Sequence, residues 1–84
     1  MNNFPSRETV ERIRKQYPVG CRVELVRMDD FQAPPMGTKG IVTGVDDTGS
    51  IMVRWENGSS LNVVYGEDLS RRIEEEYAHH EKTF

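Results

Sequence analysis

The chain has a single cysteine, Cys21, so it cannot form a disulfide within itself. It has no apolar run near the roughly 20 residues that a membrane-spanning helix needs. Its first residues have neither the basic start nor the apolar run of a secretory signal. The net charge is −3, whereas proteins that bind the nucleic-acid backbone non-specifically usually have a strong excess of positive charge. These absences predict a cytoplasmic protein with no membrane segment.

The chain is also short. Its 84 residues allow one domain, and a helix and a tail occupy part of that length. A compact unit of this size buries only about 60% of the surface of its unfolded chain, which leaves little room for a deep catalytic cleft. We therefore expect a binding module and no enzyme.

A helix is predicted over residues 6–17. Ser6 is a suitable N-cap, and Val10, Ile13 and Tyr17 form one narrow apolar stripe. An isolated helix of this length is marginal in water, so the stripe should be covered. We favour a monomer in which it covers an open end of the same domain. The alternative is a homodimer that pairs this helix with its copy.

From residue 20 the apolar residues alternate with polar ones, as in half-buried strands. The predicted strands are 22–26, 40–45, 51–55, 61–65 and 70–73. Gly44 predicts a bulge inside the second of these. Asn57-Gly58 predicts a type I′ hairpin turn, in which both residues have positive φ.

The order of these elements is that of an SH3-like barrel. The predicted fold is mainly β: a small five-stranded SH3-like barrel with an N-terminal α-helix and a charged C-terminal tail. Residues 1–19 form the helical extension, 20–73 the barrel, and 74–84 a tail that is either helical or disordered. The predicted core contains Val23, Leu25, Val42, Val45, Ile51, Val53, Trp55, Leu61, Val63, Leu69 and Ile73.

Several short sequence runs in this region carry, in combination, a resemblance to a family of proteins. They are CRVELVRM at 21–28, APP at 33–35, GTKG at 37–40, VRW at 53–55 followed by Asn57-Gly58, and YGED at 65–68. The stretch 20–73 thereby resembles an uncharacterised family of short proteins from Gram-positive bacteria and their phages or mobile elements, known as a domain of unknown function. The resemblance implies an SH3-like fold. It implies no activity and supplies no catalytic residues.

The long loop 28–40 is the predicted partner-binding surface, because exposed apolar side chains on a loop often mark an interaction site. Its candidate residues are Asp29, Asp30, Phe31, Pro34, Pro35 and Met36. Acidic residues beside an aromatic suit a basic or proline-containing peptide, so a protein or peptide partner is favoured. The competing interpretation is that the prolines stiffen the loop and Phe31 caps one end of the barrel.

Arginine and lysine side chains support an alternative function, a nucleic-acid-binding accessory protein of a phage or mobile element. Its contacts would be Arg7, Arg14 and Lys15 on the helix, together with Arg71 and Arg72. Ordinary cross-strand pairing of the arginines on strands with Glu24 and Glu56 is the simpler interpretation, and we favour it.

The remaining chemistry-bearing residues predict no cofactor and no metal. Trp55 shares a strand face with other apolar residues, so we place it in the core and do not treat it as a stacking platform. Asp46-Asp47 suit the capping of a turn, and His79-His80 lack the further ligands of a zinc site. Cys21 is expected to be a small packed residue and no nucleophile.

Overall fold

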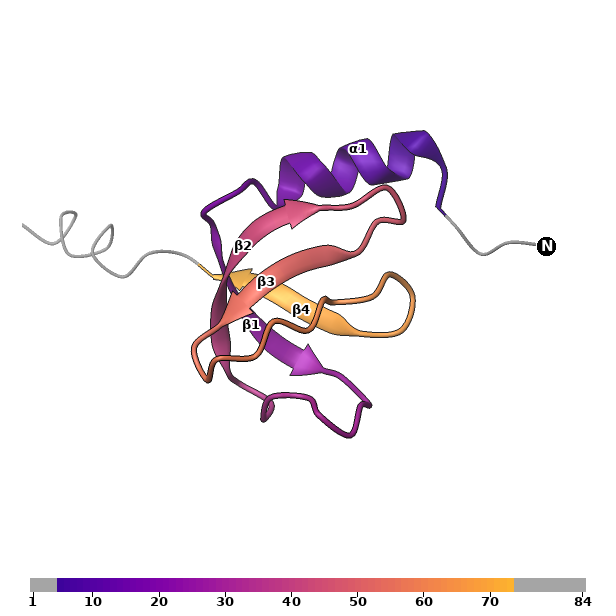
Figure 1. Cartoon of the computed structure of the whole chain (residues 1–84). Helices are drawn as coiled ribbons and strands as arrows, with labels where there is room; N and C mark the ends of the chain where they lie inside the picture. The colour runs from indigo at the N-terminus through magenta and orange to yellow at the C-terminus, as the bar shows by residue number, and fades with distance from the viewer. Residues whose placement is uncertain (1–4, 74–84) are drawn as a thin grey trace, which may run out of the picture.

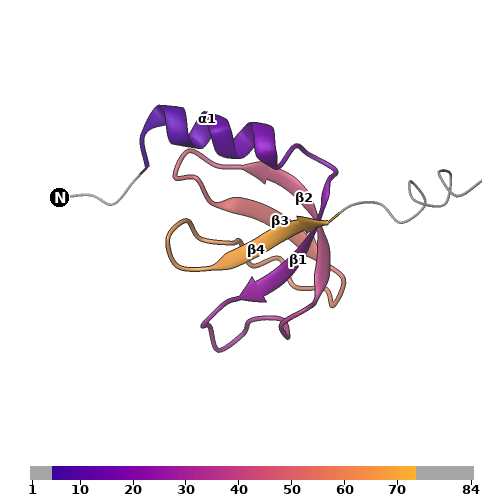
Figure 2. The ribbon, with the colours of Figure 1, turned by 180° about the vertical axis from the view of Figure 1, so that it is seen from behind.

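The computed structural model describes residues 5–73 as one antiparallel sheet with a short helix laid across it (Figure 1). The elements are α1 (Arg7–Gln16), β1 (Arg22–Arg27), β2 (Lys39–Val45), β3 (Ile51–Trp55) and β4 (Leu69–Ile73). The strand order is β3-β2-β1-β4, and the sheet is not closed. Figure 2 shows β4 beside β1 from behind. The predicted tail 74–84 lies outside the described residues.

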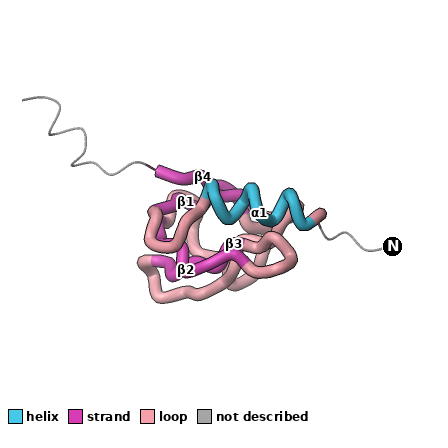
Figure 3. The backbone as a smooth tube through the Cα atoms, turned by 90° about the horizontal axis from the view of Figure 1, so that it is seen from above, coloured by secondary structure: helices cyan, strands magenta, loops and turns pink. Residues whose placement is uncertain are grey.

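The predicted helix is confirmed, and its apolar stripe faces the chain's own sheet. The Ser6 hydroxyl accepts a hydrogen bond from the Thr9 backbone N–H at 3.1 Å, which caps the first turn. Val10 is buried in the core, and Ile13 and Tyr17 pack against it. Seen from above, α1 lies over the strands (Figure 3). The stripe therefore has a partner within the same chain.

Residues of α1, of β1 to β3 and of the segment after β3 share the core. The buried apolar residues are Val10, Val23, Leu25, Val42, Val45, Ile51, Val53, Trp55 and Val63. Trp55 is a core residue, as predicted, and its indole N–H donates to the Leu61 carbonyl at 2.8 Å. A buried indole N–H needs such a partner.

The predicted core was wrong along β4. Leu69 is 55% exposed, and Ile73 is only partly buried. Ser70 is the residue of β4 that is buried, because successive side chains of a strand point to opposite faces. Leu61 is also only partly buried.

The turn at Asn57-Gly58 differs from the predicted type I′ hairpin. Gly58 has a φ of 94°, but no non-glycine residue among those described has positive φ. The Gly58 N–H donates to the Trp55 carbonyl at 2.9 Å, and the Trp55 N–H donates to the Ser59 carbonyl at 3.0 Å. This is the pattern of a three-residue loop, a type I turn closed by a glycine in the left-handed region. The prediction failed because Asn-Gly serves both turn types.

A second turn, at residues 46–50, repeats this hydrogen-bond pattern around Asp46 and Gly49. One carboxylate oxygen of Asp46 accepts from the backbone N–H groups of Thr48 and Ser50, both at 3.0 Å, and from the Thr48 hydroxyl at 2.6 Å. Burial alone would raise the pKa of Asp46, but these hydrogen bonds, with the nearby Arg14 charge, hold it below its ordinary value. The predicted capping role of this acidic pair is therefore filled by Asp46.

The predicted bulge at Gly44 is confirmed, since the pairing of β2 with β3 shifts register between Val42 and Gly44. The predicted strand 61–65 is reduced to one bridge, between Ile51 and Val63. After Val63 the chain leaves the strand direction, because the Val64 carbonyl accepts the N–H groups of residues 67 and 68. Over residues 5–73 four strands therefore form the sheet in place of the predicted five, and the sheet is not closed.

Candidate functional site

The loop between β1 and β2, residues 28–38, lies at the end of the sheet opposite α1 (Figure 1). Backbone hydrogen bonds fasten its return to β1: Gly37 N–H donates to the Leu25 carbonyl and Leu25 N–H to the Thr38 carbonyl, both at 2.8 Å. Thr38 closes the last turn through its N–H and hydroxyl, which both donate to the Pro35 carbonyl. The loop therefore has a defined conformation without any partner.

Two large apolar side chains on this loop face solvent. Phe31 is fully exposed and Met36 is 75% exposed. Phe31 therefore caps no end of the sheet, in contrast to one interpretation of the sequence. Pro34 is buried and Pro35 is exposed, so of the two prolines only the second is available to a partner.

Two exposed acidic residues precede Phe31 on the loop, Asp29 and Asp30. One carboxylate oxygen of Asp30 accepts from the Gln32 backbone N–H at 2.7 Å, and the Asp30 carbonyl accepts from the Ala33 N–H at 3.0 Å. Asp30 thus shapes the loop in the way that aspartates stabilise turns. Asp29 is exposed, and among the described residues none donates a hydrogen bond to its carboxylate.

Three of the four arginines of the predicted nucleic-acid surface, Arg14, Arg71 and Arg72, are engaged with acceptors of the same chain. Arg14 donates to the Val45 carbonyl at 3.1 Å and to the Asp47 carboxylate at 2.9 Å. Arg72 donates to the Gln16 carbonyl at 3.0 Å.

Two ion pairs connect strands: one joins the neighbours β1 and β4, and the other joins β1 to the residue that follows β3, across β2. Arg71 pairs with Glu24 across β1 and β4 at 2.6 Å, and Arg22 pairs with Glu56 at 3.5 Å. The expected cross-strand pairing with the two glutamates is confirmed. Guanidinium groups held in this way are less available to phosphates.

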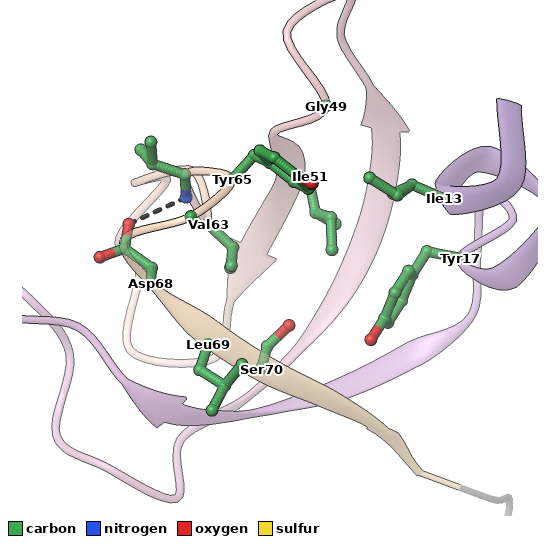
Figure 4. A pocket seen from close by; sticks show the side chains of 11 residues that line it. Ile13, Tyr17, Gly49, Ile51, Val63, Tyr65, Asp68, Leu69 and Ser70 are labelled. Carbon is green, nitrogen blue, oxygen red and sulfur yellow. Dashed lines mark hydrogen bonds between the residues drawn. The ribbon is translucent and has the colours of Figure 1, made fainter. Parts of the chain in front are cut away.

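A pocket that sequence reasoning missed lies between α1, β4 and the segment 63–66. Its cavity has a volume of about 240 Å³. Figure 4 shows Ile13 and Tyr17 on one side, Ile51 and Val63 behind, and Ser70 at the edge formed by β4. The lining is mostly apolar, so its residue types did not distinguish the pocket from core in the sequence.

The Ser70 hydroxyl is the one buried side-chain polar atom without a hydrogen-bond partner among the described residues. Ser70 as a whole is 9% exposed. Its hydroxyl points toward the space that the pocket residues surround (Figure 4). A buried polar group without a hydrogen-bond partner lowers the stability of a fold by roughly 1–3 kcal/mol. An apolar residue of similar size at position 70 would avoid this loss.

Two ionisable groups near β4 have raised pKa values. Burial raises the pKa of the Tyr17 hydroxyl, the neighbouring Cys21 adds to the effect, and Arg72 partly opposes it. Burial also raises the pKa of the Cys21 thiol, again opposed in part by Arg72. A raised pKa lowers the thiolate fraction at neutral pH, which is the direction opposite to that of activated cysteines.

Within residues 5–73 no helix has the length and apolar content to cross a membrane. The same residues bring together no group of three or more histidine, cysteine, aspartate or glutamate side chains that could hold a metal ion.

Residues 6–73 match the family described as "Domain of unknown function (DUF4314)". The match covers most of the chain, from the N-cap of α1 to the last residue of β4. The chain therefore belongs to this family. A comparison with curated proteins finds no match.

Proposed function

We propose that this chain is a non-catalytic binding module that holds a protein or peptide partner through the loop 28–40 and the turns beside it. The observation that carries the proposal is the full exposure of Phe31 on a loop that its own hydrogen bonds hold in place. Keeping a large aromatic side chain in water forgoes about 1.5–3 kcal/mol of burial. A partner that covers Phe31 recovers this free energy without having to order the loop.

The chemistry of the loop favours a partner segment that is apolar and basic. Met36 and Pro35 extend the exposed apolar surface beyond Phe31. The Asp29 carboxylate adds a negative charge next to it, and the chain as a whole has a net charge of −3. Opposite charge on the partner speeds association and aligns the two surfaces.

The proposal is tested by selecting peptides from a random library against the full chain and measuring their affinity by titration calorimetry. The Phe31→Ser, Met36→Ser double variant should weaken the selected peptides about 30-fold, since a buried aromatic anchor contributes roughly 2 kcal/mol or more. Val19→Ser is the matched control, because Val19 is 73% exposed and lies outside the loop. Equal affinity of the double variant and the wild type would refute the proposal.

A nucleic-acid-binding role remains the alternative, and the full chain and its arginine variants test it. It would use Arg7 and Lys15, which are exposed on α1. It would also have to release Arg14, Arg71 and Arg72 from their present acceptors. Binding to DNA or RNA that weakens steeply with salt, and that is lost on Arg71→Ala with Arg72→Ala, would replace the peptide proposal. Absence of binding at low salt would remove the alternative.

We further infer that the fold is an opened SH3-like barrel in a cytoplasmic protein of a Gram-positive bacterium or its mobile elements. The fold inference is supported by the order of neighbours across the sheet. The bridge between Val63 and Ile51 places Val63 beside β3, so that the order becomes Val63, β3, β2, β1, β4. Origin and location rest on the resemblance and on the single cysteine. A solution structure in which segment 61–65 runs apart from both β3 and β4 would contradict the fold inference.

A further inference from the structure

The outer edge of β4 carries backbone hydrogen-bonding groups that the sheet does not use. Leu25 on β1 directs both its N–H and its carbonyl to residues 37 and 38, on the side of β2. Its partner on β4 is Ser70. Leu25 and Ser70 are therefore a non-hydrogen-bonded pair of the antiparallel ladder. In such a pair the N–H and carbonyl of each residue point away from the partner strand. Ser70 therefore presents both groups at the free edge.

The same alternation applies two residues along. Val23 pairs with Gly40 on β2 and with Arg72 on β4, so Arg72 also directs its N–H and carbonyl outward. Arg71, between them, bonds inward to Glu24. Among the described residues no strand pairs with this side of β4. A free edge of this kind is a template for another extended chain.

The pocket opens beside this edge, and Ser70 belongs to both. Its cavity of about 240 Å³ is lined by apolar side chains of α1, β3 and the segment 63–66. A cavity of about 150 Å³ holds benzene, so this one has room for a leucine or phenylalanine side chain. The Ser70 hydroxyl, buried and without a partner among the described residues, points into the same space (Figure 4).

The charge at one end of the edge indicates the chemistry of an occupant. Glu67 is exposed and forms no ion pair with the described residues. The neighbouring Asp68 carboxylate accepts from the Val64 N–H at 2.9 Å and also adds negative charge there. A basic residue at this end of the partner would complement both groups.

We propose that the outer edge of β4 is a second peptide-binding site, which takes an extended segment with an apolar side chain and a basic residue. The segment adds as a strand and exchanges backbone hydrogen bonds with Ser70 and Arg72. The side chain opposite Ser70 enters the cavity, because paired residues share a face of the sheet. The next side chain lies on the outer face beside exposed Leu69. The basic residue lies toward Glu67.

The test titrates the full, isotope-labelled chain with a threonine-rich heptapeptide that has a lysine at each end and leucine at its centre. Binding should slow amide hydrogen exchange at Ser70 and Arg72 at least tenfold, while Arg71, already bonded within the sheet, stays unchanged. The same peptide with alanine at its centre should bind about tenfold more weakly, because the cavity stays unfilled.

Variants separate this site from the loop and from general charge effects. Glu67→Lys should weaken the leucine peptide about fivefold, whereas Glu8→Lys, the same charge change on the exposed side of α1, should not. Arg72→Pro removes one outward N–H without removing a bond of the sheet and should also weaken binding. The Phe31→Ser, Met36→Ser variant should bind this peptide normally.

Three results would overturn the proposal. The first is no binding at millimolar concentrations of peptides with leucine, valine or phenylalanine at the centre. The second is exchange protection at residues 28–38 in place of Ser70 and Arg72. The third is an equal loss of affinity for Glu67→Lys and Glu8→Lys. Because the loop proposal is tested with separately selected peptides, either proposal can fail while the other stands.

Discussion

Replacing Val10 by alanine tests whether the apolar stripe of α1 holds the helix on the sheet. Val10 is 4% exposed and belongs to the core. The change removes the equivalent of two buried methylene groups, about 1.6 kcal/mol at 0.8 kcal/mol each, and a remaining cavity adds to this. The better helix propensity of alanine offsets at most about 0.7 kcal/mol. The free energy of unfolding should therefore fall by about 1–2 kcal/mol.

Trp55 provides the assay for this prediction. It is the only tryptophan of the chain and is 2% exposed, so its fluorescence reports unfolding in urea. For a domain of this size, 1 kcal/mol corresponds to roughly 4–8 °C in Tm, so the variant should melt roughly 4–16 °C lower. The denaturant slope should stay unchanged, because the same surface is exposed.

Lys15→Ala is the control, because Lys15 is an exposed residue of the same helix. It should leave stability within about 0.5 kcal/mol of the wild type. If Val10→Ala were as stable as this control, the packing of α1 would not contribute to the fold. A loss seen only at high protein concentration would instead place Val10 in contact with a second copy.

The remaining predictions concern the turns and the strands. Because hydrogen bonds outweigh burial and hold the pKa of Asp46 below its ordinary value of 3.8, the carboxylate stabilises the fold above that pH, and this contribution is lost as the pH falls through the folded-state pKa. Asp46→Ala should therefore cost about 1–2 kcal/mol at neutral pH in urea unfolding, with the difference from wild type shrinking below pH 3.8. Gly40→Ala should cost about 1–3 kcal/mol or prevent folding, because its new Cβ would lie 2.5 Å from a valine methyl and 2.8 Å from a backbone carbonyl of β3. Gly44→Ala should cost less, since its one close contact is the flexible end of a methionine, and equal losses at both glycines would contradict the steric argument. Glu24→Gln should cost about 0.2–1 kcal/mol through loss of the pair with Arg71. That loss should shrink in 1 M salt, and a loss independent of salt would indicate another cause.

Much of the fold follows from local patterns. The N-cap at Ser6, the stripe of α1, the bounds of β3 and the bulge at Gly44 were all predicted and are all observed. Each depends on residues within one element or on its period, which a sequence displays directly. The burial of Trp55 follows for the same reason, since it shares a face with Ile51 and Val53.

The sequence predicted less about the candidate sites. It singled out the loop around Phe31 because exposed apolar side chains on a loop often mark an interaction site. It did not show that Pro34 is buried or that Asp30 is committed to the turn, because both depend on how the loop folds back on itself. The arginines looked like a possible patch, and only the positions of Glu24 and Gln16 in space show what holds them.

The sequence by itself determined the helix α1, the strands β1 to β3 and which of their faces turn inward, because side-chain period and capping act over a few residues. Only the tertiary structure decided how the sheet ends. Whether segment 61–65 pairs fully or leaves after one bridge depends on contacts between distant parts of the chain, and here the turn at Val64 and Asp68 takes it away from the sheet. Within residues 5–73 no strand pairs with the outer edge of β4, and the pocket beside Ser70 lies between that edge and this turn.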